Sequence, residues 1–224
     1  MSAIGKSDFE KFLVQAALPS AKSKLPEGLK TSNLVWDAVW RAHRDVVLAR
    51  QHVAPYSNYG NEPWASPAKR EPNAIAARLY EILVQWPEGE PLGSRSLIDQ
   101  LLRGVKRNGQ KVVFDERQLF GSVQKLVNMT LKYLVMLQLF GASDKYLERL
   151  PVISVDECDC PLDSIVLDKL GGRFREMKWT RLSRQEYEEA QEEIEANQEV
   201  SGLRYDLENW SGWNADVHWA GDAK

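Results

Sequence analysis

Cysteine is scarce in this sequence, and its placement limits the chemistry the chain can perform. The 224 residues contain only Cys158 and Cys160, which are too close together for an ordinary structural disulfide and too few for a four-thiolate zinc or iron–sulfur site. The three histidines, His43, His52 and His218, show no recognisable metal-binding spacing. We therefore expect neither a metal nor another cofactor, and a reducing cytoplasm fits two free thiols.

Long apolar runs are also missing. No stretch approaches the roughly 18 apolar residues of a membrane helix, and the segment from Met1 to Lys6 lacks the apolar core of a signal peptide. The 29 Lys and Arg residues against 32 Asp and Glu give a formal net charge of -3, which argues against nonspecific coating of nucleic acid. Gly-rich phosphate loops and the Gly-x-Ser-x-Gly elbow of esterases are absent as well. We expect a soluble, cytoplasmic monomer with no membrane partner.

What the sequence does contain is helical periodicity. Apolar residues recur at steps of three and four in most long segments, whereas strand-like alternation is confined to short pieces such as 111–114 and 152–155. The pattern predicts a mainly α fold. Its helices, bounded by Pro, Gly and a capping box at 183–186, are expected at 7–17, 33–53, 73–85, 94–106, 122–140, 162–170 and 184–197.

Three segments stand apart in composition. The four prolines and three aromatic residues of 54–73 predict an ordered loop over a surface, and the acidic run 186–199 predicts a solvated helix face. The tail 207–224 holds Trp210, Trp213 and Trp219 among few aliphatic residues. It could fold back to cap the core or form an aromatic wall for a ligand, and the sequence leaves both open.

Two further segments carry the polar residues that could perform chemistry. In the expected helix 122–140, Lys125 and Lys132 are seven positions apart and share a face beside an apolar stripe. They could simply extend along the ends of a core helix with their ammonium groups in water. In the second segment, Pro161 and Asp163 precede a short apolar helix that Gly171 ends. By itself, an Asp in this position is an N-cap.

Taken together, these segments resemble the helix–hairpin–helix superfamily of DNA glycosylases. The pattern Leu-x-Gly-x-x-x-Lys-x-x-Asn-x-x-Leu over 119–131 is similar to the hairpin and catalytic-lysine helix of the endonuclease III family. Gln124 and Lys125 followed by Lys132 look more specifically like the archaeal 8-oxoguanine glycosylase branch. The run Pro-Leu-Asp-Ser over 161–164 resembles the start of the helix that carries the catalytic aspartate. The resemblance covers about 118–170; within it Val123 stands where the common hairpin has its second Gly, and the four-cysteine cluster is absent.

The resemblance implies one glycosylase-like domain over 1–224, with two helical lobes around a cleft and a helix–hairpin–helix. It implies that Lys125 attacks the sugar C1′ to form a Schiff base, and that Asp163 stabilises the cationic sugar and assists deprotonation. Gly121, Gln124 and Lys132 are then expected to contact substrate or DNA.

The expected partner is double-stranded DNA with a damaged or modified base, with a purine such as 8-oxoguanine favoured. A basic face would hold its phosphates, formed by Arg103, Lys106, Arg107, Lys111 and Arg117. A non-catalytic helical module that binds DNA or another protein is the alternative, because one scaffold can host unrelated functions.

Overall fold

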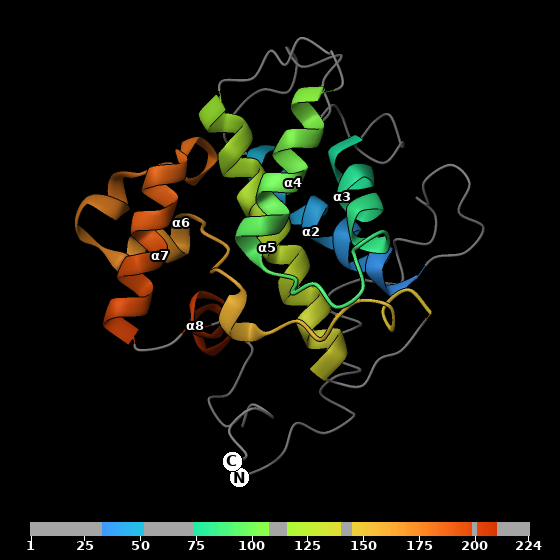
Figure 1. The fold of residues 1–224 in the computed structure, drawn as a ribbon. Coiled ribbons are helices and arrows are strands. Elements are labelled where there is room, and N and C mark those ends of the chain that lie inside the picture. Colours follow the sequence, from blue (N-terminus) through green and yellow to red (C-terminus); the bar gives the residue numbers. More distant parts are fainter. Residues whose placement is uncertain (1–32, 52–73, 108–115, 140–144, 199–200, 210–224) are drawn as a thin grey trace, which may run out of the picture.

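The computed structural model describes residues 33–51, 74–107, 116–139, 145–198 and 201–209 (Figure 1). Within these ranges the regular structure is helical and no strand occurs, so the predicted mainly α class is confirmed. The α-helices are α2 (Leu34–Gln51), α3 (Ala74–Val84), α4 (Ser94–Arg107), α5 (Glu116–Leu139), α6 (Ser164–Leu170), α7 (Arg184–Gln198) and α8 (Gly202–Asn209). Short 3-10 helices lie at η3 (Val155–Glu157), η4 (Gly172–Glu176) and η5 (Trp179–Arg181).

Six of the expected helices are present, with shifted ends. The largest shift is in α5, which begins at Glu116 rather than at Ser122. The strand-like piece 152–155 is instead a loop over 152–154 followed by the first residue of η3. The expected helix 7–17, the strand-like piece 111–114, the loop 54–73 and the tail beyond residue 209 lie outside the described residues.

Local signals explain several helix ends. Asn33 caps α2, because its Oδ1 accepts a hydrogen bond from the Trp36 N–H at 2.9 Å. The capping box of α7 is also present: the Ser183 Oγ accepts from the Glu186 N–H at 3.2 Å, and the Glu186 Oε2 accepts from the Ser183 N–H at 2.7 Å. Along α7, Tyr187, Ala190 and Ile194 are buried at helical spacing, while its glutamates are partly or fully exposed. The prediction of a solvated acidic face is therefore confirmed for the described part of 186–199.

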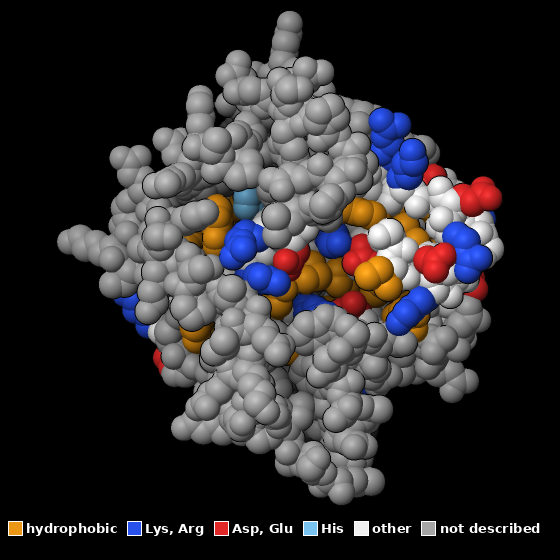
Figure 2. Space-filling view, turned by 180° about the vertical axis from the view of Figure 1, so that it is seen from behind, with side chains coloured by type: hydrophobic (Ala, Val, Ile, Leu, Met, Phe, Trp, Pro, Cys, Tyr) orange, Lys and Arg blue, Asp and Glu red, His pale blue; other side chains and the backbone are white. Residues whose placement is uncertain are grey.

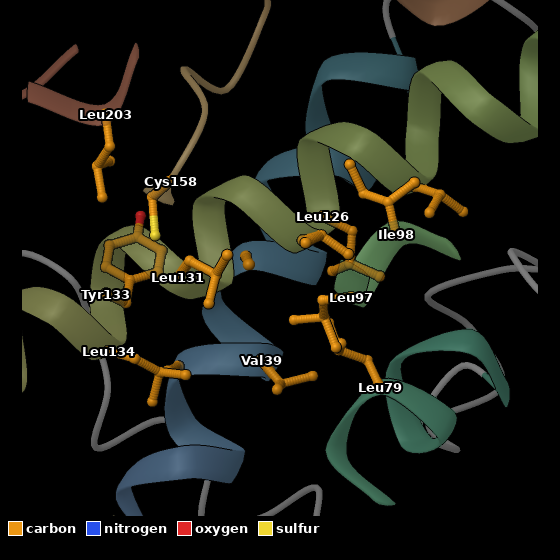
Figure 3. Close-up of a cluster of buried hydrophobic side chains, with 14 of the residues drawn as sticks. Val39, Leu79, Leu97, Ile98, Leu126, Leu131, Tyr133, Leu134, Cys158 and Leu203 are labelled. Carbon is orange, nitrogen blue, oxygen red and sulfur yellow. The ribbon is translucent and has the colours of Figure 1, made fainter. Parts of the chain in front are cut away.

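Helix α5 runs through the middle of the described fold. It packs against α2 and α4 on one side and against η5 on the other, and Figure 1 shows it between α2–α4 and the group α6–α8. Figure 3 shows Leu126 and Leu134 of α5 among side chains from α2, α3 and α4, with Tyr133 near Cys158 and Leu203. From Leu119 to Leu137 every α5 residue except Met129 is buried. Polar side chains on this stretch therefore face protein.

The expected glycosylase-like arrangement of two lobes around a cleft stays a prediction. The same holds for the single domain over 1–224, since the described residues cover only part of that range. None of the described helices is both long enough and apolar enough to cross a bilayer.

Candidate functional site

Lys125 and Asp163 meet in the structure, although 38 positions separate them in the chain. Lys125 lies in α5, and Asp163 directly precedes α6. The Lys125 Nζ is 3.3 Å from the Asp163 Oδ2. The lysine side chain is 8% exposed and the aspartate side chain 28% exposed. The convergence that the sequence predicts is therefore present, and water reaches the pair from the aspartate side.

Asp163 uses its two carboxylate oxygens for different contacts. Its Oδ1 accepts hydrogen bonds from the N–H groups of Ile165 at 2.9 Å and Val166 at 3.1 Å, which makes Asp163 the N-cap of α6. Its Oδ2 faces Lys125. The two roles considered from the sequence, helix cap and partner of Lys125, are compatible because each needs only one oxygen.

Trp179 covers the ammonium group of Lys125 from a third element. The Lys125 Nζ lies 4.6 Å from the centre of the Trp179 ring, a distance typical of a cation–π contact. Trp179 opens η5 and is itself buried. Nothing in the sequence links this residue to Lys125, because the contact arises only when η5 packs on α5.

Gly121 allows η5 to approach α5 closely. A Cβ atom at this position would collide with the carbonyl oxygen of Trp179 and lie 2.9 Å from the carbonyl carbon of Thr180. Gly121 is the sixth residue of α5, so its N–H lies beyond the first four that a helix leaves unpaired. Gly121 is thus inside a buried helix and not in a hairpin turn, and its expected contact with substrate or DNA stays a prediction.

Gln124 binds the backbone of the residue that precedes Asp163. Its Nε2 donates to the carbonyl oxygens of Leu162 at 3.0 Å and Gly121 at 3.1 Å, and its Oε1 accepts from the Leu162 N–H at 3.3 Å. The side chain is fully buried. In this structure its amide fixes the segment that carries Asp163, and the expected contact of Gln124 with substrate or DNA stays a prediction.

A second amide side chain, that of Gln191, forms an equivalent pair of hydrogen bonds with the backbone of Cys160. Gln191 of α7 accepts from the Cys160 N–H at 2.9 Å and donates to the Cys160 carbonyl at 2.8 Å. Asn128 of α5 also donates to this carbonyl, at 3.4 Å, and to the Tyr187 hydroxyl, at 2.9 Å. We call Gln124, Asn128 and Gln191 the amide clamp. Because the clamp satisfies buried backbone groups at alternate residues, it holds 160–162 much as a neighbouring strand would.

A buried polar cluster adjoins the clamp. The Tyr187 hydroxyl donates to the Asp159 carboxylate at 2.7 Å, and the Arg95 guanidinium lies 3.5 Å from the same oxygen. The Asp159 N–H donates to the Ser94 hydroxyl at 2.8 Å. Burial raises the pKa of the Asp159 carboxyl, while the hydrogen bond from Tyr187 and the charge of Arg95 act in the opposite direction. These contacts tie α4 and α7 to the residues just before the clamp.

Lys132 is engaged inside the protein. Its Nζ lies 2.6 Å from the Asp206 Oδ2 of α8, and its side chain is 3% exposed. The expected contact of Lys132 with substrate or DNA stays a prediction. The second lysine joins α8 to α5.

No protein-family model, curated protein or solved structure matches the chain. The resemblance to glycosylases therefore rests on the residues of 118–170 themselves. Any function must be argued from those residues and from the contacts that surround them.

The remaining predicted residues fall in different places. Arg103 is exposed on α4 and donates to the Asp99 carbonyl at 3.2 Å. Lys106 and Arg107 lie in α4 and Arg117 in α5, while Lys111 is outside the described residues. His43 is buried in α2 and stacks on Trp40, with ring centres 5.1 Å apart.

Metal and thiol chemistry receive no support from the described part of the chain. Its His, Cys, Asp and Glu residues form no group of three that could hold a metal ion. Cys158 and Cys160 are free and buried. Burial raises the pKa of both thiols, which keeps them protonated and unreactive.

The amide clamp leads to a first prediction. Gln124→Leu is expected to lower the melting temperature, because each buried backbone group of Leu162 left unpaired costs about 1–3 kcal/mol. It should also speed hydrogen exchange at the Ile165 and Val166 amides, since Asp163 loses its fixed position. Amide exchange followed by NMR measures this effect.

Gln191→Leu is the matched control, because it removes the equivalent pair of hydrogen bonds from Cys160. Its melting temperature should fall by less, because Asn128 still donates to the Cys160 carbonyl, and exchange at Ile165 and Val166 should change less than in Gln124→Leu. Equal acceleration in both variants would show that Gln124 has no special part in placing Asp163.

Proposed function

We propose that the protein is a DNA glycosylase with abasic-site lyase activity, acting on a damaged or modified base in double-stranded DNA. The contact of Lys125 with Asp163 carries this proposal: the Nζ and Oδ2 atoms lie 3.3 Å apart although they come from separate segments. These are the residues at which the two segments resemble helix–hairpin–helix glycosylases. The resemblance also favours a purine such as 8-oxoguanine as the excised base.

The chemistry begins when the target nucleotide leaves the duplex and its sugar reaches Lys125. The Lys125 amine must be unprotonated. We expect the Asp163 Oδ2 to accept its proton and, because this side chain is 28% exposed, to pass it on to water and become charged again. The Nζ attacks C1′ as the bond from C1′ to the base breaks, and the base leaves with the electron pair of that bond. The charge of Asp163 stabilises the cationic sugar during this step.

The covalent product accounts for the lyase activity. The attached Nζ loses a proton, and its lone pair then forms the C=N bond as the bond between C1′ and the ring oxygen breaks. The ring oxygen takes up a proton, and a Schiff base joins Nζ to the opened sugar. Removal of a proton from C2′ then expels the 3′ phosphate and cleaves the strand. The side from which the sugar approaches is the aspartate side, because Asp163 is 28% exposed and Lys125 only 8%.

A non-catalytic DNA-binding or protein-interaction module is the second candidate, and a specific observation favours it. Gly121, Gln124 and Lys132 were expected to contact substrate or DNA, yet all three are buried with internal contacts. In such a module, Lys125 and Asp163 would serve only as an ion pair beside a helix cap.

Borohydride trapping distinguishes the two candidates. The protein is mixed with duplexes that carry an abasic site or one of a panel of damaged and modified bases, and sodium borohydride reduces any Schiff base to a stable bond. A covalent complex supports the enzyme. A protein that binds these duplexes but forms no complex and releases no base is the non-catalytic module.

Asp163→Asn tests the charge of the aspartate separately from its capping role. The amide oxygen of Asn can still accept from Ile165 and Val166, so the cap should persist. Loss of the charge beside the buried Lys125 ammonium should lower the free energy of unfolding by up to about 3 kcal/mol. The single-turnover rate of excision should fall by about 10²–10³, because the neutral side chain no longer stabilises positive charge. Rates and melting temperatures are measured on the same preparations.

Asp168→Asn is the control for this substitution. Asp168 lies on the same helix, is exposed, and pairs with Arg175 at 2.7 Å instead of with a lysine of α5. Its rate should match that of the wild type. If Asp163→Asn lowers stability but leaves the rate unchanged, Asp163 is a helix cap only.

A further inference from the structure

The segment 169–184, which we call the basic connection, joins α6 to α7 through η4 and η5. It holds six basic residues and a single acidic one, Glu176, in a chain whose formal net charge is -3. All six basic side chains are exposed: Lys169, Arg173, Arg175, Lys178, Arg181 and Arg184. Figure 2 shows Lys and Arg side chains spread over the described surface at its right, the side to which α6 and α7 turn from Figure 1.

Half of these cations are already matched by carboxylates. Arg173 pairs with Glu189 at 3.0 Å, Arg175 with Asp168 at 2.7 Å, and Arg184 with Asp99. Among the described residues, Lys169, Lys178 and Arg181 have no carboxylate partner. Such exposed cations can neutralise a phosphate without first breaking an ion pair, and counterion release then drives the binding.

Two of the unmatched cations lie next to the Lys125 site. Lys178 and Arg181 flank Trp179 and Thr180, and the Trp179 ring covers the Lys125 Nζ at 4.6 Å. The backbone between them is held against α5, because Gly121 leaves room for the Trp179 carbonyl. The positions of Lys178 and Arg181 relative to Lys125 are therefore set by a close backbone contact.

We propose that Lys178 and Arg181 bind the phosphates on either side of the nucleotide whose sugar reaches Lys125. The partner is the backbone of double-stranded DNA, so the inference rests on the proposed function and deepens it. A strand whose sugar contacts Lys125 necessarily carries a phosphate on each side of that sugar. This surface is distinct from the basic face that the sequence predicts around Arg103, which stays a prediction.

The test compares two double variants with the same change in net charge. Lys178→Glu/Arg181→Glu reverses the proposed contacts. Lys145→Glu/Arg149→Glu reverses one other exposed lysine and one other exposed arginine, both in the described segment before η3. Binding is measured by fluorescence anisotropy on a labelled duplex with a tetrahydrofuran abasic analogue, which allows binding without excision, and on the same duplex without the lesion.

The expected results are specific. The Kd of Lys178→Glu/Arg181→Glu should rise by at least about tenfold, and its dependence on salt should fall by about two released counterions. The Kd of the control variant should stay within about twofold of the wild-type Kd, which is a smaller change than the loss of one phosphate contact would cause. Both variants should keep the wild-type melting temperature to within a few degrees, because the substituted side chains are exposed. An unchanged salt dependence in the first variant, or an equal loss in the control, overturns the proposal.

Its failure is distinguishable from failure of the proposed function. If the wild type binds DNA through Lys178 and Arg181 but forms no covalent complex on abasic DNA, the phosphate-binding surface is supported and the enzyme is overturned. If the protein forms the covalent complex but its affinity for DNA does not depend on these two residues, the enzyme is supported and the surface is overturned. A wild type that binds neither duplex overturns both.

Discussion

Replacing Lys125 with alanine is expected to abolish covalent trapping of the protein on DNA. Only an amine at this position can form the Schiff base with C1′, and alanine supplies none. The fold should persist, since Asp163 is partly exposed and keeps its hydrogen bonds to Ile165 and Val166. Gel electrophoresis after borohydride reduction should show no covalent complex above background, while circular dichroism shows the helical content of the wild type.

Two further variants control for charge and for position. Lys125→Arg keeps a positive charge beside Asp163, yet guanidinium is too basic to attack, so trapping should again be lost. Lys132→Met/Asp206→Leu removes both partners of a second buried ion pair among the described residues of α5, so trapping should persist. If trapping persists in Lys125→Ala but disappears in the double variant, the nucleophile is Lys132 and not Lys125.

Gly121→Ala should destabilise the protein by about 3 kcal/mol, because an added methyl group meets backbone and not a side chain that could move away. For a chain of this size, the melting temperature should then fall by roughly 6–12 °C. Movement of η5 should also draw Trp179 away from Lys125. Thermal unfolding and tryptophan fluorescence measure the two effects.

The direction in which Gly121→Ala changes the melting temperature distinguishes a packed glycine from an exposed one. In a helix without tertiary contacts, alanine is more favourable than glycine by about 1 kcal/mol, so the same substitution would raise stability. If Gly121 instead presented its amide to DNA, affinity for DNA would fall while stability rose. A melting temperature equal to or above that of the wild type would therefore contradict the contact between α5 and η5.

The helices could largely be predicted from the sequence because most have apolar residues on one face only. Helix α8 could not: its buried residues Leu203, Tyr205 and Leu207 step by two, which is not a helical period. The sequence also predicts too late a start for α5, at Ser122, directly after Gly121. A glycine inside a helix is tolerated where another backbone must come close, and Gly121 is such a residue.

The candidate site was predictable only in part. Lys125 and Asp163 stand in short local patterns, whereas Trp179 and Gln191 reach the site through tertiary packing that leaves no mark on spacing. The resemblance assigns Gln124 and Lys132 to substrate or DNA, and nothing in their spacing indicates their partners inside the protein. Helix α5 is buried on all sides, so its polar side chains must find partners within the protein.

The amide clamp also fixes how α5 is aligned with the segment that follows Asp159. Along α5, Gln124 and Asn128 are one turn apart, and they meet Leu162 and Cys160 in the reverse order of the chain. An interface of apolar side chains alone would tolerate sliding by a turn or rotation about the axis. Here, any such slip would leave buried amides facing carbon atoms. The register of helix and segment is thus unique, and with it the alignment of Lys125 with Asp163.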